Sequence, residues 1–157
     1  MAACLQPPTL GDSLSAVLFA LALANAPQSR CPDAVTTIEV NACLGAALMD
    51  LDKEMDRYYD AAVDRLKAEH RAPADEALSE LARAQTAWRT YRDAECGAVY
   101  SYWREGTIRT NVALNCQISL TRLRVFSLWR DWLTYPDSTP PILPRPDLAA
   151  ALVEGLR

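Results

Sequence analysis

Residues 84–96 read AQTAWRTYRDAEC, and this stretch decides the fold. Its apolar and half-polar residues recur at steps of three and four, which is the spacing of one face of an α-helix. The face extends in both directions and consists of Leu78, Leu81, Gln85, Trp88, Arg92, Cys96 and Val99. Because a cysteine lies on this buried face, the pattern indicates a helical domain crosslinked to a neighbouring segment.

Two further helices are predicted, one on each side of this segment. The first begins where Thr36 and Glu39 have the spacing of a capping box, and it should extend to about His70. The third follows a turn at residues 104–110, in which Gly106 breaks the helical pattern. Their apolar stripes are Leu44, Leu48, Leu51, Met55, Tyr59, Ala62 and Leu66, and then Leu114, Ile118, Thr121, Val125, Leu128 and Trp132. The expected fold is all-α, a small up-down-up three-helix bundle with two disulfides, a proline-rich C-terminal tail and a short terminal helix at 147–156.

The N-terminal segment has the character of an export signal. Residues 14–26 form an apolar run that ends in small residues, and the best cleavage position follows Ala26. No Lys or Arg precedes the run and Asp12 lies just before it, so a misplaced start codon and an unprocessed helix are the alternatives. The expected organisation is a signal peptide at 1–26, a helical domain at 27–135 and a proline-rich tail at 136–157.

Length and charge narrow the classes of function. About 130 residues would remain after cleavage, which is enough for one domain with its own core. The formal charge is −4, so no nucleic-acid partner is expected. After the leader, no run is apolar for the length needed to span a bilayer, so no transmembrane segment is expected. Acids are concentrated in the first helix and bases in the third, which favours packing of these two helices side by side.

Four cysteines lie downstream of the leader, at Cys31, Cys43, Cys96 and Cys116. An even set behind a leader is typical of disulfides in the periplasm or outside the cell. Of the three possible pairings, geometry favours Cys96–Cys116, since both lie about 10 Å from the turn that joins their helices. Cys31 then pairs with Cys43, and each bond stabilises by about 3 kcal/mol. Zinc is the alternative, but close CxxC spacing is absent, so no metal or other cofactor is expected.

Three motifs follow one another along the chain: EVNAC at 39–43, DKEMDRYY at 52–59 and QTAWRTYRDAEC at 85–96. Together with the outer cysteines they resemble the LprI-like family, the lysozyme-inhibitor LprI N-terminal domains of bacterial envelope proteins. Met55 and Asp56 stand where that family has Leu and Asn, and the resemblance covers about Cys31 to Leu128. Besides the cysteines, the matching residues are Glu39, Asn41, Asp52, Tyr59, Gln85, Trp88, Tyr91, Arg92, Asp93, Thr121 and Arg124.

The resemblance implies a non-enzymatic exported binding protein, periplasmic or secreted, that inhibits lysozyme-type muramidases such as c-type lysozyme. The alternatives are an envelope module that binds another protein, with the tail as a spacer, and an unrecognised hydrolase. No catalytic site is expected, because the chain has one histidine and no glycine-rich phosphate loop.

Most of the matching residues are interpreted as structural. Trp88 should lie in the core rather than stack on a ligand. Arg92 and Asp93 point about 100° apart on a helix, so we expect them to bind the first and third helices and not each other. A recognition role for these two residues is the alternative.

One charge pattern suggests a partner-facing surface. Asp56, Asp60 and Asp64 repeat every four residues, roughly opposite the apolar stripe of the first helix. A solvated face is one interpretation, and a negative strip that attracts a cationic partner such as lysozyme is the other. The turn from Trp103 to Thr110 is the exposed segment best placed to enter a partner's cleft.

Overall fold

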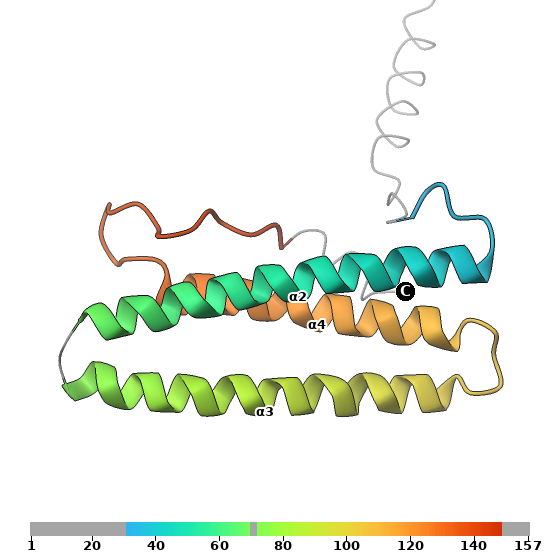
Figure 1. Cartoon of the computed structure of the whole chain (residues 1–157), viewed down its shortest axis with the longest axis horizontal. Helices are drawn as coiled ribbons and strands as arrows, with labels where there is room; N and C mark the ends of the chain where they lie inside the picture. Colours follow the sequence, from blue (N-terminus) through green and yellow to red (C-terminus); the bar gives the residue numbers. More distant parts are fainter. Residues whose placement is uncertain (1–30, 70–71, 149–157) are drawn as a thin grey trace, which may run out of the picture. The chain divides into compact units, whose positions relative to one another are not determined.

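The structure is a computed structural model, and it describes residues 31–69 and 72–148. Three helices make up most of this region: α2 (Thr37–Ala68), α3 (Ala72–Tyr102) and α4 (Arg109–Trp132). They run up, down and up (Figure 1), and the described ranges contain no strand. The predicted all-α three-helix bundle is therefore confirmed. The predicted leader, and nearly all of the predicted helix at 147–156, lie outside the described residues.

Helix α2 starts at the predicted capping box. The Thr36 hydroxyl accepts a hydrogen bond from the Glu39 N–H (3.2 Å), and the Glu39 carboxylate accepts one from the Thr36 N–H (2.8 Å). These bonds satisfy donors that the first helical turn leaves without partners. The backbone N–H of Thr36, followed by that of Val35, holds the pKa of Glu39 below its usual range. Glu39 thus has a structural role.

The core lies mainly between α2 and α4, which share the most extensive interface of the bundle. This packing places the acidic first helix beside the basic third one, as predicted. Tyr58 is buried in this core although it lies next to the expected apolar stripe and not on it. The buried members of the core cluster are Met55, Tyr58, Ala62, Leu66, Ala74, Leu81, Val125, Leu128 and Leu133.

Two disulfides are present, as predicted. Cys96 of α3 and Cys116 of α4 are bonded to each other, with 5.6 Å between their Cα atoms. Cys31 and Cys43 are the other disulfide-bonded cysteines. In α2, α3 and α4 alike, the cysteine lies about two turns from the end of the bundle at which α2 begins. Covalent reinforcement is therefore concentrated at that end.

The proline-rich tail does not extend away from the bundle. Residues 136–148 turn back after α4 and run along the helices (Figure 1), and Leu143 packs against the core. Backbone carbonyls of the tail accept hydrogen bonds from the buried Tyr58 and the partly buried Trp129. The bonds that fasten the tail run from Ile142 N to Leu133 O (2.9 Å), from Trp129 Nε1 to Leu143 O (3.1 Å) and from Tyr58 Oη to Pro144 O (2.7 Å).

Arg65 of α2 secures the point at which the tail leaves α4. Its Nη1 donates to the carbonyl oxygens of Trp132 and Thr134, and its guanidinium lies 4.5 Å from the ring centroid of Tyr135. A cation at this position offsets the negative end of α4 and satisfies carbonyls that have no helical partner. The tail therefore begins in a defined direction.

Removing the Tyr58 hydroxyl should weaken the attachment of the tail without creating a large cavity. Tyr58→Phe leaves the Pro144 carbonyl without its donor, so we expect the free energy of unfolding to fall by about 1 kcal/mol. Urea denaturation of the oxidised protein measures the change. Tyr91→Phe is the matched control, because Tyr91 is 53% exposed. Equal stability of the two variants would contradict this role of Tyr58.

Candidate partner-binding surfaces

A buried guanidinium joins the three helices. Arg92 of α3, whose side chain is 9% exposed, donates through Nη1 to Asp52 of α2 (2.6 Å) and to Thr121 of α4 (3.0 Å). The fully buried Thr121 hydroxyl donates in turn to the Gln117 carbonyl (2.8 Å). The predicted contacts of Arg92 with the first and third helices are thus present. Three of the motif residues, Arg92, Asp52 and Thr121, therefore hold the helices together.

Gln85 makes a second polar link, nearer the start of α3. Its Nε2 lies 2.7 Å from the Met55 sulfur, and its Oε1 accepts a hydrogen bond from Arg124 Nε (2.9 Å). Burial lowers the pKa of Arg124 below its ordinary value. Trp88 lies between the two links, with its ring centroid 5.0 Å from the Arg92 guanidinium carbon, and packs against the core as predicted.

The prediction that Arg92 and Asp93 do not pair with each other is wrong. Arg92 Nε lies 3.4 Å from Asp93 Oδ1. The guanidinium carries donors on three nitrogens, so Nη1 reaches across the bundle while Nε still faces the neighbouring carboxylate. Because the Asp93 side chain is 65% exposed, solvent weakens this ion pair.

The remaining motif residues differ in their surroundings. Tyr59 is half-buried against the core, whereas Tyr91 is 53% exposed. The Asn41 side-chain oxygen is buried and has no hydrogen-bond partner within the described part of the chain. Packing in the core thus accounts for the presence of Tyr59 in the motif, but it does not account for Tyr91.

The predicted acidic strip divides into two parts. Asp56 forms an ion pair with Arg89 of α3, and both side chains are about half exposed, at 50% and 42%. Asp60 and Asp64 are exposed on α2. Asp64 also lines an open depression beside Arg65 and Tyr135. Arg89 thus offsets the charge of Asp56, and Asp60 and Asp64 are the stronger candidates for facing a partner.

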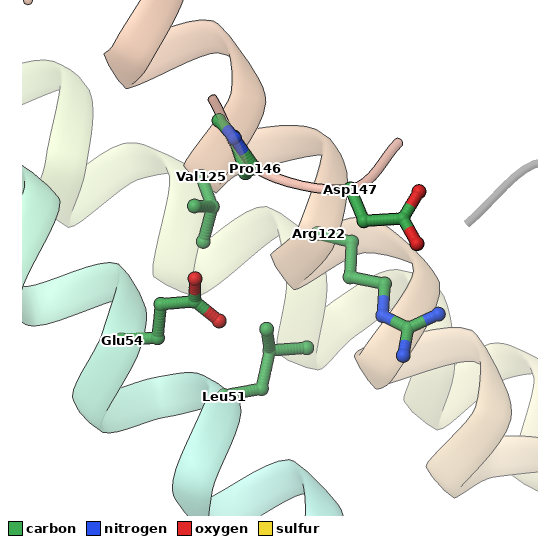
Figure 2. Close-up of a pocket in the computed structure, with 6 residues that line it drawn as sticks. All are labelled: Leu51, Glu54, Arg122, Val125, Pro146 and Asp147. Atoms are coloured by element: carbon green, nitrogen blue, oxygen red, sulfur yellow. The ribbon is translucent and has the colours of Figure 1, made fainter. Parts of the chain in front are cut away.

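The pocket between α2, α4 and the tail is small. Figure 2 shows Glu54 pointing into it, and its volume of about 190 Å³ lies below the roughly 300 Å³ at which ligand pockets begin. Within the described ranges, no group of three or more His, Cys, Asp or Glu side chains could hold a metal ion. The pocket is lined by Leu51, Glu54, Arg122, Val125, Pro146 and Asp147.

The start of α2 lies at the same end of the bundle as the turn from α3 into α4 (Figure 1). The segments at this end carry several exposed large apolar side chains. Tyr102 is 85% exposed, and its ring packs edge-to-face against Trp103 with 5.9 Å between centroids. Sequence reasoning singled out only the turn that begins at Trp103. The other residues could have been noticed as large apolar side chains lying off the core stripes. The aromatic end, as we name this surface, consists of Val35, Ile38, Tyr100, Tyr102, Trp103 and Ile108.

No helix in the described ranges carries an apolar stretch long enough to cross a bilayer.

The Arg92 and Arg89 ion pairs should differ sharply in their effect on stability. Arg92→Lys replaces the planar guanidinium that donates to both α2 and α4. It should lower the free energy of unfolding by about 3 kcal/mol. Arg89→Lys changes a half-exposed pair and should lower it by less than about 1 kcal/mol. Urea denaturation of both variants measures the difference, and similar losses would contradict the central role of Arg92.

Comparison with known proteins places this bundle in a family. Residues 28–128 match the sequence model of the family described as lysozyme inhibitor LprI. A protein of Rhizobium meliloti (strain 1021), described as uncharacterized, is 31% identical over 124 residues, covering 74% of this chain and 89% of that protein. No solved structure shows a significant match. The match to the family includes both disulfides and the Arg92 contacts and ends before the tail. The chain therefore belongs to the LprI lysozyme-inhibitor family.

Proposed function

We propose that this protein is an exported, non-enzymatic inhibitor of lysozyme-type muramidases that acts in the periplasm or outside the cell. The observation that carries the proposal is the family match over residues 28–128, because it spans most of the described bundle. The two disulfides support an oxidising compartment, where such bonds persist.

The architecture suits a protein that binds through a preformed surface. A disulfide joins α3 to α4, and the Arg92 contacts join all three helices. A binding protein that is already ordered loses less conformational entropy on association. Rigidity of this kind supports inhibition by docking.

The exposed acids of α2 support a cationic partner. Asp60 and Asp64 add negative potential to a chain that is already acidic. A field of this sign raises the encounter rate with a positively charged enzyme more than it raises affinity. Lysozyme, a strongly cationic enzyme, fits this requirement.

The alternative of an envelope module with a spacer tail has less support. Residues 142–144 are hydrogen-bonded to the bundle through Leu133, Trp129 and Tyr58. A segment held in this way is not free to separate two partners. Cutting the chain at Tyr135 would also expose core residues, so it would not test this alternative cleanly.

Inhibition can be measured by the clearing of a bacterial-wall suspension by c-type lysozyme. We expect the oxidised chain from Pro27 to Arg157 to protect the walls in a dose-dependent way. A reduced and alkylated sample should not protect, because it has lost the crosslinks that hold the surface together. Absence of protection at a large molar excess of oxidised protein would contradict the proposed function.

Neutralising the exposed acids should slow association with lysozyme. Asp60→Asn combined with Asp64→Asn should lower the association rate by about threefold at low salt, with a smaller effect at high salt. Stopped-flow mixing measures the rate. Asp56 is left intact because it pairs with Arg89.

The matched control removes the same charge elsewhere, through Glu76→Gln combined with Glu95→Gln, two exposed acids of α3. If this variant slowed association as much as the α2 variant, net charge and not the position of Asp60 and Asp64 would be responsible.

A further inference from the structure

We infer that the aromatic end is the surface that docks on the muramidase, and that it does so at the substrate cleft of the enzyme. This inference rests on the proposed function and names the contact surface for it. Three independent features carry it: the exposure of apolar side chains, the reinforcement of the same end, and the chemistry of the side chains found there.

The exposure is concentrated rather than scattered. Six of the ten large hydrophobic side chains that are exposed in the described ranges belong to the aromatic end. Single exposed apolar residues need no explanation, but several at one end of a bundle favour an interaction surface there. Tyr102 at 85% and Ile38 at 81% are far from any role in the core.

The turn that carries this surface is held in one conformation. Gly106 N donates to Trp103 O (2.8 Å), and Arg109 Nη1 donates to Arg104 O (3.0 Å). A Cβ at Gly106 would lie 3.3 Å from the Trp103 carbonyl oxygen, so the turn is closely packed there. The disulfide between Cys96 and Cys116 fixes the two helices about two turns behind it. A surface that is ordered before binding loses little entropy on docking.

The side chains match what a sugar-binding cleft offers. Tyr and Trp rings combine apolar faces with polar tips, which suits a site built to contact both the faces and the hydroxyls of sugars. Glycosidase clefts also hold a pair of catalytic carboxylates. Arg104 lies on the turn with its side chain 77% exposed, and only a long 3.9 Å contact links it to Glu105. Its guanidinium is therefore available to a carboxylate of the enzyme.

The acidic pair of α2 lies elsewhere. Measured along the helix at about 1.5 Å per residue, Asp60 lies about 35 Å and Asp64 about 40 Å from the start of α2. If the aromatic end makes the contact, these acids influence the encounter but not the lifetime of the complex. The two contributions can therefore be separated kinetically.

The test compares the oxidised chain from Pro27 to Arg157 with two variants, one in the aromatic end and one at the neighbouring Arg104, and with one control variant. Tyr102→Ser combined with Trp103→Ser should weaken inhibition of c-type lysozyme by about 30-fold, mainly through faster dissociation. Arg104→Glu, which replaces an exposed side chain, should weaken it by about tenfold or more. Tyr91→Ser is the matched control, because it removes an exposed tyrosine from the middle of α3, and it should leave inhibition unchanged. Circular dichroism and the mass of the intact disulfides verify folding.

Two further measurements test the inference: competition by a ligand of the enzyme cleft, and the dissociation rate of the variant that lacks the acidic pair. An N-acetylglucosamine oligosaccharide that fills the enzyme cleft should compete with the wild-type protein, and binding without competition would overturn the inference. Dissociation of the Asp60→Asn/Asp64→Asn variant should match the wild type.

The outcomes separate this inference from the function on which it rests. If the wild type inhibits and both Tyr102→Ser/Trp103→Ser and Arg104→Glu inhibit as well as it does, the inference is overturned and the proposed function stands. If the wild type neither binds nor inhibits lysozyme, both the inference and the proposed function are contradicted. If the aromatic variants instead abolish a dimer of this chain in sedimentation and leave lysozyme binding intact, the surface serves self-association and the inference is overturned.

Discussion

The buried guanidinium of Arg92 sets the alignment of the three helices. It needs acceptors from α2 and α4 at once, since leaving it unpaired in the interior would cost several kcal/mol. Sliding a helix by one turn, about 5.4 Å, would remove one of these acceptors. Apolar stripes alone do not forbid such a shift, because neighbouring turns offer similar side chains. The apolar core supplies most of the stability, while the polar link selects one register.

The position of the aromatic end follows from that register. With α3 held against α4 at Thr121, the cysteines that flank the 103–108 turn come level and form their bond. The contact of Asp52 with Arg92 holds α2 in register with α3. The start of α2 lies at the same end of the bundle as the turn (Figure 1). Val35 and Ile38 thus join the residues of the turn although they are more than 60 positions away in sequence. A contact deep in the bundle therefore shapes a surface.

Patterns along the sequence predicted the helices, the helix cap and the Cys96–Cys116 disulfide. The features that they missed depend on contacts between residues far apart in the sequence. Capping at Thr36, the helical stripes and the Cys96–Cys116 pair depend on spacing along one or two helices, which the sequence shows directly. The pairing of Asp56 with Arg89 depends on how two helices face each other, so the strip looked like three equivalent acids. Tyr58 looked peripheral to the stripe because its partner, the Pro144 carbonyl, comes from a tail 86 residues away. The aromatic end was only partly foreseen for the same reason.

The tail also determines which surfaces remain for a partner. It occupies the side of α2 and α4 where Tyr58 and Trp129 donate hydrogen bonds, and its Leu143 covers part of the core. Displacing it would break these bonds and expose apolar area, so a partner would gain less by binding there than at a surface already open. The aromatic end carries most of the exposed large hydrophobic side chains of the described ranges and lies outside the covered face. The tail lies outside the family match, which ends at residue 128. Its described part, residues 136–148, narrows the docking options of the bundle because it covers one face of α2 and α4 and not the aromatic end.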